Sequence, residues 1–178
     1  QYEIPEKSNN CEPPGMPTMM TMPYSLEFVF APGKIIVNQE AEMMVRRIYT
    51  DGRGHPADPD PTFHGHSIGH WEGNTLVVET MNVEPKQGSF ISDKGKVTER
   101  FTRASNDQIL YEYTVEDPTR YTQPWKGQMP LNAQPNGLYE YACLEGNYSM
   151  FNLLAGARAL EREGRKAPMR KAIFAGVE

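Results

Sequence analysis

Residues 66–83 read HSIGHWEGNTLVVETMNV, and this stretch decides the fold class. Two predicted strands, residues 66–72 and 75–83, flank the tight-turn sequence Glu72-Gly73-Asn74. In the second strand Leu76 and Val78 alternate with less apolar residues, so that successive side chains lie on opposite faces of a strand. The stretch therefore predicts a β-hairpin.

The same alternation recurs along most of the chain, between short segments rich in turn residues. The sequence holds 15 Gly and 15 Pro, which is typical of many short elements joined by turns. Further strands are predicted over residues 25–31, 34–39, 42–50, 96–103, 108–115, 123–131 and 138–143. About nine short strands in all predict an all-β fold, either an antiparallel barrel or a strongly bent sheet, because such closure leaves few exposed edges.

One helix is predicted near the end of the chain, over residues 149–165, with Ser149 as its cap and Gly164 as its stop. Its apolar residues recur at helical spacing. They are Met150, Leu153, Leu154, Ala157 and Leu160. We expect this amphipathic helix to pack on the β body.

The length predicts a single domain over residues 1–178. We expect an irregular arm rich in Pro and Met over 1–24, a β body over 25–148, the helix, and a basic and apolar tail over 166–178. Flexible Met16, Met19, Met20 and Met22 are expected to fill gaps in the core; the alternative is Cu(I) binding through their thioethers.

The net charge of −5 argues against a nucleic-acid partner. No apolar run has the length needed to cross a bilayer. The chain begins at Gln1, which fits a mature periplasmic or secreted protein that has lost a signal peptide, and fits a trimmed chain equally well.

Two cysteines lie far apart, at Cys11 and Cys143, in neither a CxxC nor a zinc-finger spacing. A disulfide between them would contribute ~4–5 kcal/mol by closing a long loop. We expect this disulfide rather than two free thiols, because it fits an oxidising compartment.

Several blocks of the sequence resemble a family of bacterial exported β-domain proteins with the signature GHSIGxWEGxTLVVxT and no assigned activity. Its signature is matched by residues 65–80, and its other blocks by residues 11–17, 46–53, 117–125 and 139–143. His66 matches the signature, whereas His64, His70 and Asn74 stand where the family usually carries other residues. The resemblance implies an exported β domain and supplies no catalytic residue.

All four histidines, His55, His64, His66 and His70, fall within residues 55–70. In an extended segment His64, His66 and His70 share one face and could bind Zn or Cu. The favoured alternative is a turn entering a strand, with one histidine hydrogen-bonded and two solvated, and no cofactor.

Four strand glutamates, Glu79, Glu99, Glu112 and Glu140, lie beside aromatic residues. A buried one could act as a general acid or base, although most strand glutamates face water. Arg46 is among the arginines expected to balance them. No phosphate loop, GxSxG or HExxH motif is present, so whether the chain is an enzyme stays open, with the balance against it.

The tail is basic although the chain is acidic, which is typical of a docking segment. Its candidate docking residues are Arg162, Arg165, Lys166, Arg170, Lys171 and Phe174. The leading hypothesis is a non-enzymatic protein-binding module, an accessory subunit on the periplasmic face of a membrane complex such as a respiratory or photosynthetic one. The alternative is a small-ligand binder or metal-dependent enzyme that uses the barrel mouth and the three histidines.

Overall fold

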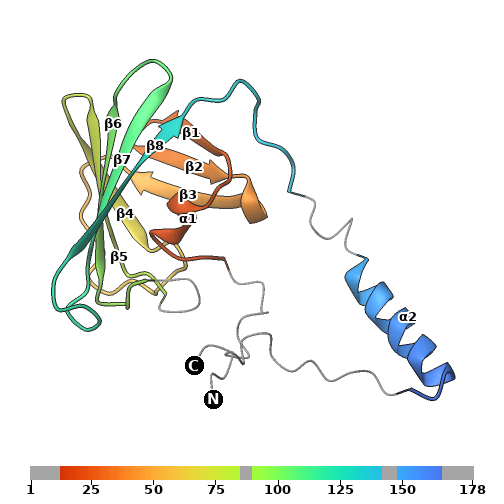
Figure 1. Ribbon diagram of the computed structural model, residues 1–178. Helices are drawn as coiled ribbons and strands as arrows, with labels where there is room; N and C mark the ends of the chain where they lie inside the picture. The colour runs from red at the N-terminus through yellow and green to blue at the C-terminus, as the bar shows by residue number, and fades with distance from the viewer. Residues whose placement is uncertain (1–12, 85–89, 142–147, 166–178) are drawn as a thin grey trace. The chain divides into compact units, whose positions relative to one another are not determined.

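The computed structural model describes residues 13–84, 90–141 and 148–165. It divides into two compact units, residues 1–141 and 142–178. The first unit is one curled sheet of eight strands that forms a half-barrel, so the all-β prediction is confirmed (Figure 1). The expectation that the whole chain is one domain stays a prediction.

The strands follow one another around the half-barrel in chain order. They are β1 Leu26–Ala31, β2 Lys34–Gln39, β3 Met44–Tyr49, β4 His66–Glu72, β5 Thr75–Met81, β6 Lys96–Arg103, β7 Gln108–Glu116 and β8 Trp125–Asn132. Two short helices accompany them, α1 Thr18–Thr21 and the 3₁₀ helix η2 Ala41–Met43.

The predicted ninth strand, residues 138–143, is not formed by its described part, residues 138–141. The described part of this segment makes side-chain contacts in place of strand pairing. The backbone N–H of Tyr139 donates to the carboxylate of Glu40 at 3.3 Å, and the ring of Tyr141 meets Tyr24 edge to face. Side-chain contacts therefore replace a backbone ladder there.

The pairing is antiparallel except between β3 and β4, which run parallel through Ile48 opposite Ser67 and Tyr49 opposite Ile68. This corrects the expectation of an entirely antiparallel sheet. The physical reason is the long connection over residues 50–65, which carries the chain back to the end of the sheet where β3 began.

The concave face of the sheet holds the core, as period-two alternation requires. Ile35, Val37, Ile48, Val78 and Val97 are among its buried side chains. Met16, Met19 and Met20 from the segment around α1 are at most 1% exposed and belong to the same core cluster. Their predicted place in the core is confirmed, and Met22 is partly buried and packs against the same cluster.

The second unit contains α2, Ser149–Arg162, so the helix prediction is confirmed. Its cap residue is Tyr148 rather than Ser149, which is the first helical residue. Gly164 adopts a positive φ of 66° and ends the helix as predicted, with Arg165 N donating to Leu160 O.

The apolar side chains of α2 are not all alike, because Ala157 and Leu160 are half-buried while others are exposed. Phe151, Leu153 and Leu154 are 72, 69 and 50% exposed. That the helix packs on the β body therefore stays a prediction. No helix in the described part of the chain has the length and apolar character needed to span a membrane.

Candidate functional site

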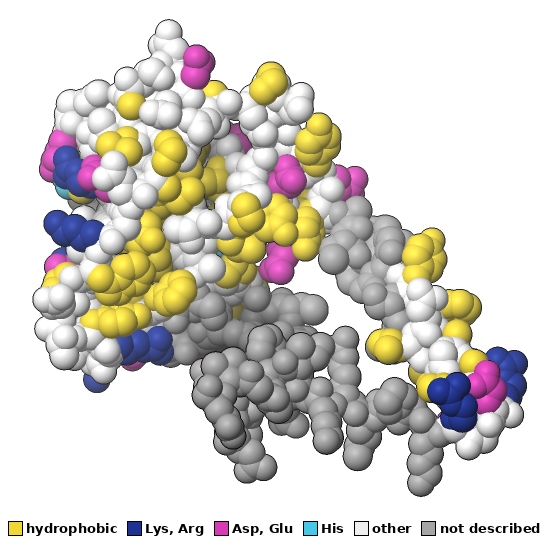
Figure 2. Space-filling view, in the orientation of Figure 1, with side chains coloured by type: hydrophobic (Ala, Val, Ile, Leu, Met, Phe, Trp, Pro, Cys, Tyr) yellow, Lys and Arg dark blue, Asp and Glu magenta, His cyan; other side chains and the backbone are white. Residues whose placement is uncertain are grey.

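The half-barrel is open between its first and last strands, β1 and β8, which do not pair with each other. A groove of about 690 Å³ lies on this side. Its apolar floor consists of Met20, Met22, Leu26, Phe28, Ile109, Met129 and Leu131. Figure 2 shows apolar side chains gathered over this face of the molecule.

The rim of the groove is polar and well connected. Arg103 donates from its guanidinium to the carbonyl oxygens of Ser105 and Asn106, at 3.2 and 3.4 Å. Gln108 donates to the side-chain oxygen of Asn132 at 2.9 Å, which joins β7 to β8 at the rim. Apolar side chains combined with fixed polar groups are the usual composition of a ligand site.

A row of aromatic rings connects the groove to the core. Phe28, which lines the groove, meets Phe101 edge to face at 5.6 Å between ring centroids. Phe101 stacks on Tyr111 at 4.9 Å, and Tyr111 on Tyr113 at 5.5 Å. Each of these rings contacts the next one, so Phe28 of the groove is joined to the packed core.

Behind this row lies a buried ion pair between Arg46 of β3 and Glu99 of β6, which are 1 and 0% exposed. Arg46 Nη1 donates to Glu99 Oε1 at 3.0 Å, and Nη2 donates to Oε2. Arg46 also donates to Ser67 Oγ at 3.2 Å and to Thr80 Oγ1 at 2.8 Å. The hydroxyl of Tyr111 donates to Glu99 Oε1 at 2.9 Å.

This cluster is saturated rather than open to a substrate. Both oxygens of Glu99 accept hydrogen bonds from protein groups. Burial, followed by the charge of Glu99, raises the pKa of Tyr111 well above its usual value, so its hydroxyl stays a donor. We assign the cluster to fixing how the five strands from β3 to β7 meet. Among the four strand glutamates, Glu99 is the one that faces the core, and its partner Arg46 is one of the arginines expected to balance the four.

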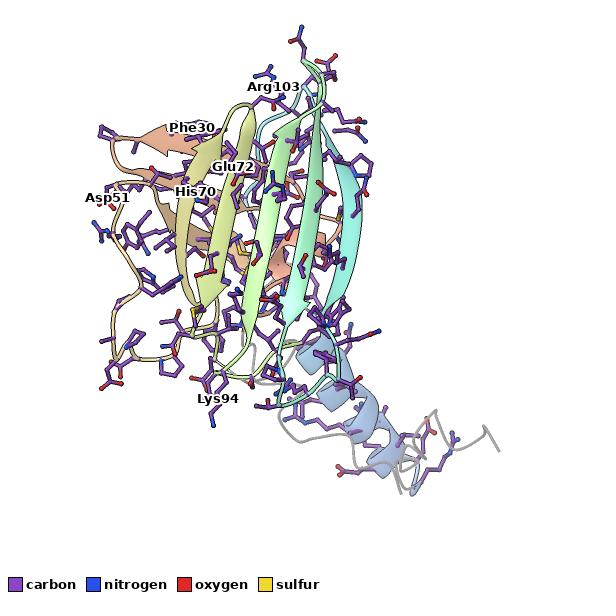
Figure 3. All side chains as sticks on the ribbon, turned by 90° about the vertical axis from the view of Figure 1, so that its left-hand side faces the viewer. Phe30, Asp51, His70, Glu72, Lys94 and Arg103 are labelled. Atoms are coloured by element: carbon purple, nitrogen blue, oxygen red, sulfur yellow. The ribbon has the colours of Figure 1, made fainter. Side chains whose placement is uncertain are left out.

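The structure does not bring His64, His66 and His70 together. Gly65 has a positive φ of 65°, which breaks the alternation between His64 and β4. His66 and His70 are four residues apart on β4, a separation of about 13 Å along a strand, which is too far for one metal ion. His70 is exposed and lies 3.2 Å from Glu72, beside it on β4 (Figure 3).

His64, which precedes Gly65 and β4, lies close to Arg46. Burial lowers the pKa of His64 to about 4, and the positive charge of Arg46 adds to this effect. A hydrogen bond with the backbone of Val45 opposes the shift. His64 is therefore neutral at physiological pH.

His66 pairs with His55 instead, on the outer face of the sheet. The two Nδ1 atoms are 2.9 Å apart, and the ring of His66 stacks on Tyr49 at 5.3 Å between centroids. Burial lowers the pKa of His66, with further contributions from His55 and Arg53. The Nε2 atom of His55 lies 3.4 Å from Glu79, without hydrogen-bond geometry.

The sequence indicated that these histidines cluster but not which pair meets, because that depends on how the loop after β3 folds over β4. Within residues 13–84, 90–141 and 148–165, no group of three or more His, Cys, Asp or Glu side chains is placed to hold a metal. The Zn or Cu hypothesis thus has no ligand set in this part of the chain.

Of the predicted docking residues, Arg162 and Arg165 lie exposed at the end of α2 and just after it. Arg162 Nε donates to Arg158 O at 3.2 Å, and Arg165 pairs with Glu163 at 3.2 Å. The remaining ones, Lys166, Arg170, Lys171 and Phe174, lie outside the described residues, as do Cys11 and Cys143 of the predicted disulfide.

The groove and its set of lining residues were not predicted from the sequence. Its floor comes from α1 and Met22 just after it, and from the strands β1, β7 and β8, which lie far apart in the sequence. Comparison with protein-family models, curated proteins and solved structures finds no match to this chain. The resemblance to an exported bacterial family stays a prediction.

Proposed function

We propose that the half-barrel is a non-enzymatic binding domain that takes a small, uncharged, largely apolar ligand in the groove between β1 and β8. The observation that carries the proposal is the groove itself, with its apolar floor and polar rim. Its volume of about 690 Å³ matches the range of about 300–1,000 Å³ typical of ligand sites.

The charges around the groove favour an uncharged ligand. Glu27, Arg103 and Asp107 are its charged lining residues, so the rim carries one negative charge in excess. Glu27 accepts a hydrogen bond from Asn38 at 2.9 Å, and Arg103 is held by backbone carbonyls. An anionic ligand would meet net repulsion, while an apolar one gains free energy by covering the floor.

Titration with N-phenyl-1-naphthylamine, a neutral apolar fluorophore, tests this function. We expect a saturable rise in its fluorescence, and weaker binding of the anionic relative 8-anilinonaphthalene-1-sulfonate. Met129→Lys places a charge on the floor and should weaken binding by at least about tenfold, which corresponds to about 1.4 kcal/mol.

Gln128→Lys is the matched control, because it adds the same charge on the opposite face of β8. It should leave the affinity unchanged. Binding that does not saturate, or that responds equally to both variants, would refute the proposal, provided that both variants melt cooperatively.

A second candidate, docking to a protein partner on the periplasmic face of a membrane complex, is favoured by the exposed Phe151, Leu153 and Leu154 of α2. The untagged chain should then co-purify with membranes, and a Phe151→Ser/Leu154→Ser variant should not. Recovery of the native chain only as free protein would count against docking. Met129→Lys should leave co-purification intact, which separates the two functions.

A further inference from the structure

The two edges of the half-barrel differ in how they are protected from pairing with another strand. β8 carries Lys126 and Pro130 at exposed positions, and both residue types block the addition of a further strand. β1 has neither residue type between Leu26 and Ala31. Within the described part of the chain, the edge of β1 is therefore open to pairing with another strand.

The exposed apolar side chains of β1 also favour pairing with another strand. Phe30 is 67% exposed and Val29 is 38% exposed, although both are on a strand. Phe30 lies at the rim of the sheet (Figure 3). No described residue pairs with the edge of β1 opposite β2. An apolar, unpaired edge of this kind is rare in a chain that functions alone.

We propose that β1 pairs with β1 of a second copy of this chain, antiparallel and about a two-fold axis at Val29. This register places Val29 opposite the same residue of the second copy and Phe28 opposite Phe30. Glu27 then lies opposite Ala31. The pairing continues the antiparallel pattern of β1 and β2 and covers the exposed Phe30 with an aromatic partner.

Charge selects this register. Ala31 is already paired with Lys34 of β2, so the two share the outer face of the sheet. The second copy's Glu27 would lie on the other side of Ala31, about 10 Å from Lys34 between backbones. Across the small Ala31 side chain the long side chains of Lys34 and Glu27 can meet, and the two-fold axis makes this pair twice.

The alternative register centred on Phe28 lacks this pair, because it places Glu27 opposite Val29. Pairing through Val29 would border the groove along Leu26 and Phe28. The inference does not rest on the proposed ligand, since it uses the strand edge and not the floor of the groove.

Sedimentation velocity over a range of concentrations, with hydrogen exchange at each, tests the proposal. The chain should dimerise, and the amides of residues 26–31 should gain protection in the dimer. Val29→Lys places like charges face to face on the axis and should weaken the dimer by at least about tenfold. Gln128→Lys, which introduces a lysine on the other edge strand, should not weaken the dimer.

Charge reversal tests the register. Glu27→Lys and Lys34→Glu should each weaken the dimer, and the double variant should restore it. A chain that stays monomeric at millimolar concentration, or a dimer whose β1 amides stay unprotected, would overturn the proposal. Val29→Lys should still bind N-phenyl-1-naphthylamine, so the failure of one proposal does not imply failure of the other.

Discussion

Arg46 and Glu99 form an ion pair in the middle of the half-barrel, where neither side chain reaches water. Removing one partner leaves a buried charge without its counterion, which costs about 3–5 kcal/mol. We expect Arg46→Met to lower the free energy of unfolding by about this amount in urea titrations, and Glu99→Gln by a similar amount.

The double variant Arg46→Met/Glu99→Met removes both charges and should recover most of the loss, because an apolar pair fills the same space. Tyr111→Phe, which deletes one hydrogen bond to Glu99, should lose only about 1–2 kcal/mol. Single variants as stable as the native chain would show that the pair does not hold the strands together.

His64 makes the stability depend on pH, because its pKa is about 4 in the folded state and 6.5 ordinarily. Between these values the unfolded chain binds a proton that the folded chain does not. The free energy of unfolding is therefore highest above pH 6.5 and falls as the pH is lowered toward 4, by about 3 kcal/mol. His66 contributes with the same sign, since burial lowers its pKa.

Urea titrations at several pH values between 4.5 and 7.5 measure the slope of the unfolding free energy against pH. His64→Gln should flatten it. A slope that persists in His64→Gln would assign the effect to other groups.

At the scale of elements, two glycines define the ends of β4 in different ways. Gly65 and Gly73 both have positive φ, 65 and 61°. A methyl group at Gly65 would collide with the carbonyl oxygen of Met81 and lie 2.9 Å from Val83 Cγ2, whereas one at Gly73 meets nothing within 4 Å. The two glycines thus share the same backbone conformation, but only Gly65 is crowded by neighbouring atoms.

We expect Gly73→Ala to lower the free energy of unfolding by about 1 kcal/mol, the usual strain of an L-residue in this region. Gly65→Ala should lose about 2–4 kcal/mol, because collision is added to strain. Equal losses of unfolding free energy in the two variants would show that the backbone at the start of β4 shifts to accommodate the methyl group at no cost.

At the scale of the whole molecule, the predicted Cys11–Cys143 disulfide would link the start of the first unit to the start of the second. Peptide mapping without reduction should recover the two cysteines in one linked peptide. Reduction should lower the free energy of unfolding by ~4–5 kcal/mol on the chain-entropy model. Two free thiols in freshly purified protein from an oxidising compartment would contradict the prediction.

Most strands were predictable because alternation is a local property. The bounds of β2, β4 and β6 coincide with those expected from sequence, and each lies beside a turn with its own residue signal. The segment 138–143 also alternates, but its described part bonds to Glu40 through Tyr139 instead of forming a ladder. Alternation alone does not show whether a neighbouring edge is free to pair.

The candidate site was less predictable, because its residues come from distant parts of the chain. Glu99 was one of four strand glutamates of equal standing until β3 and β6 placed Arg46 against it. His55 and His66 were members of one cluster, but the fold of the connecting loop made them the pair that meets.

The sequence by itself determined that this chain forms short strands with one apolar face and a terminal amphipathic helix, because side-chain periodicity depends only on local backbone geometry. Only the tertiary structure decided that β3 and β4 run parallel, that the half-barrel stays open between β1 and β8, and which polar groups meet inside it. These features depend on the registers and curvature of the whole sheet, which no single segment specifies.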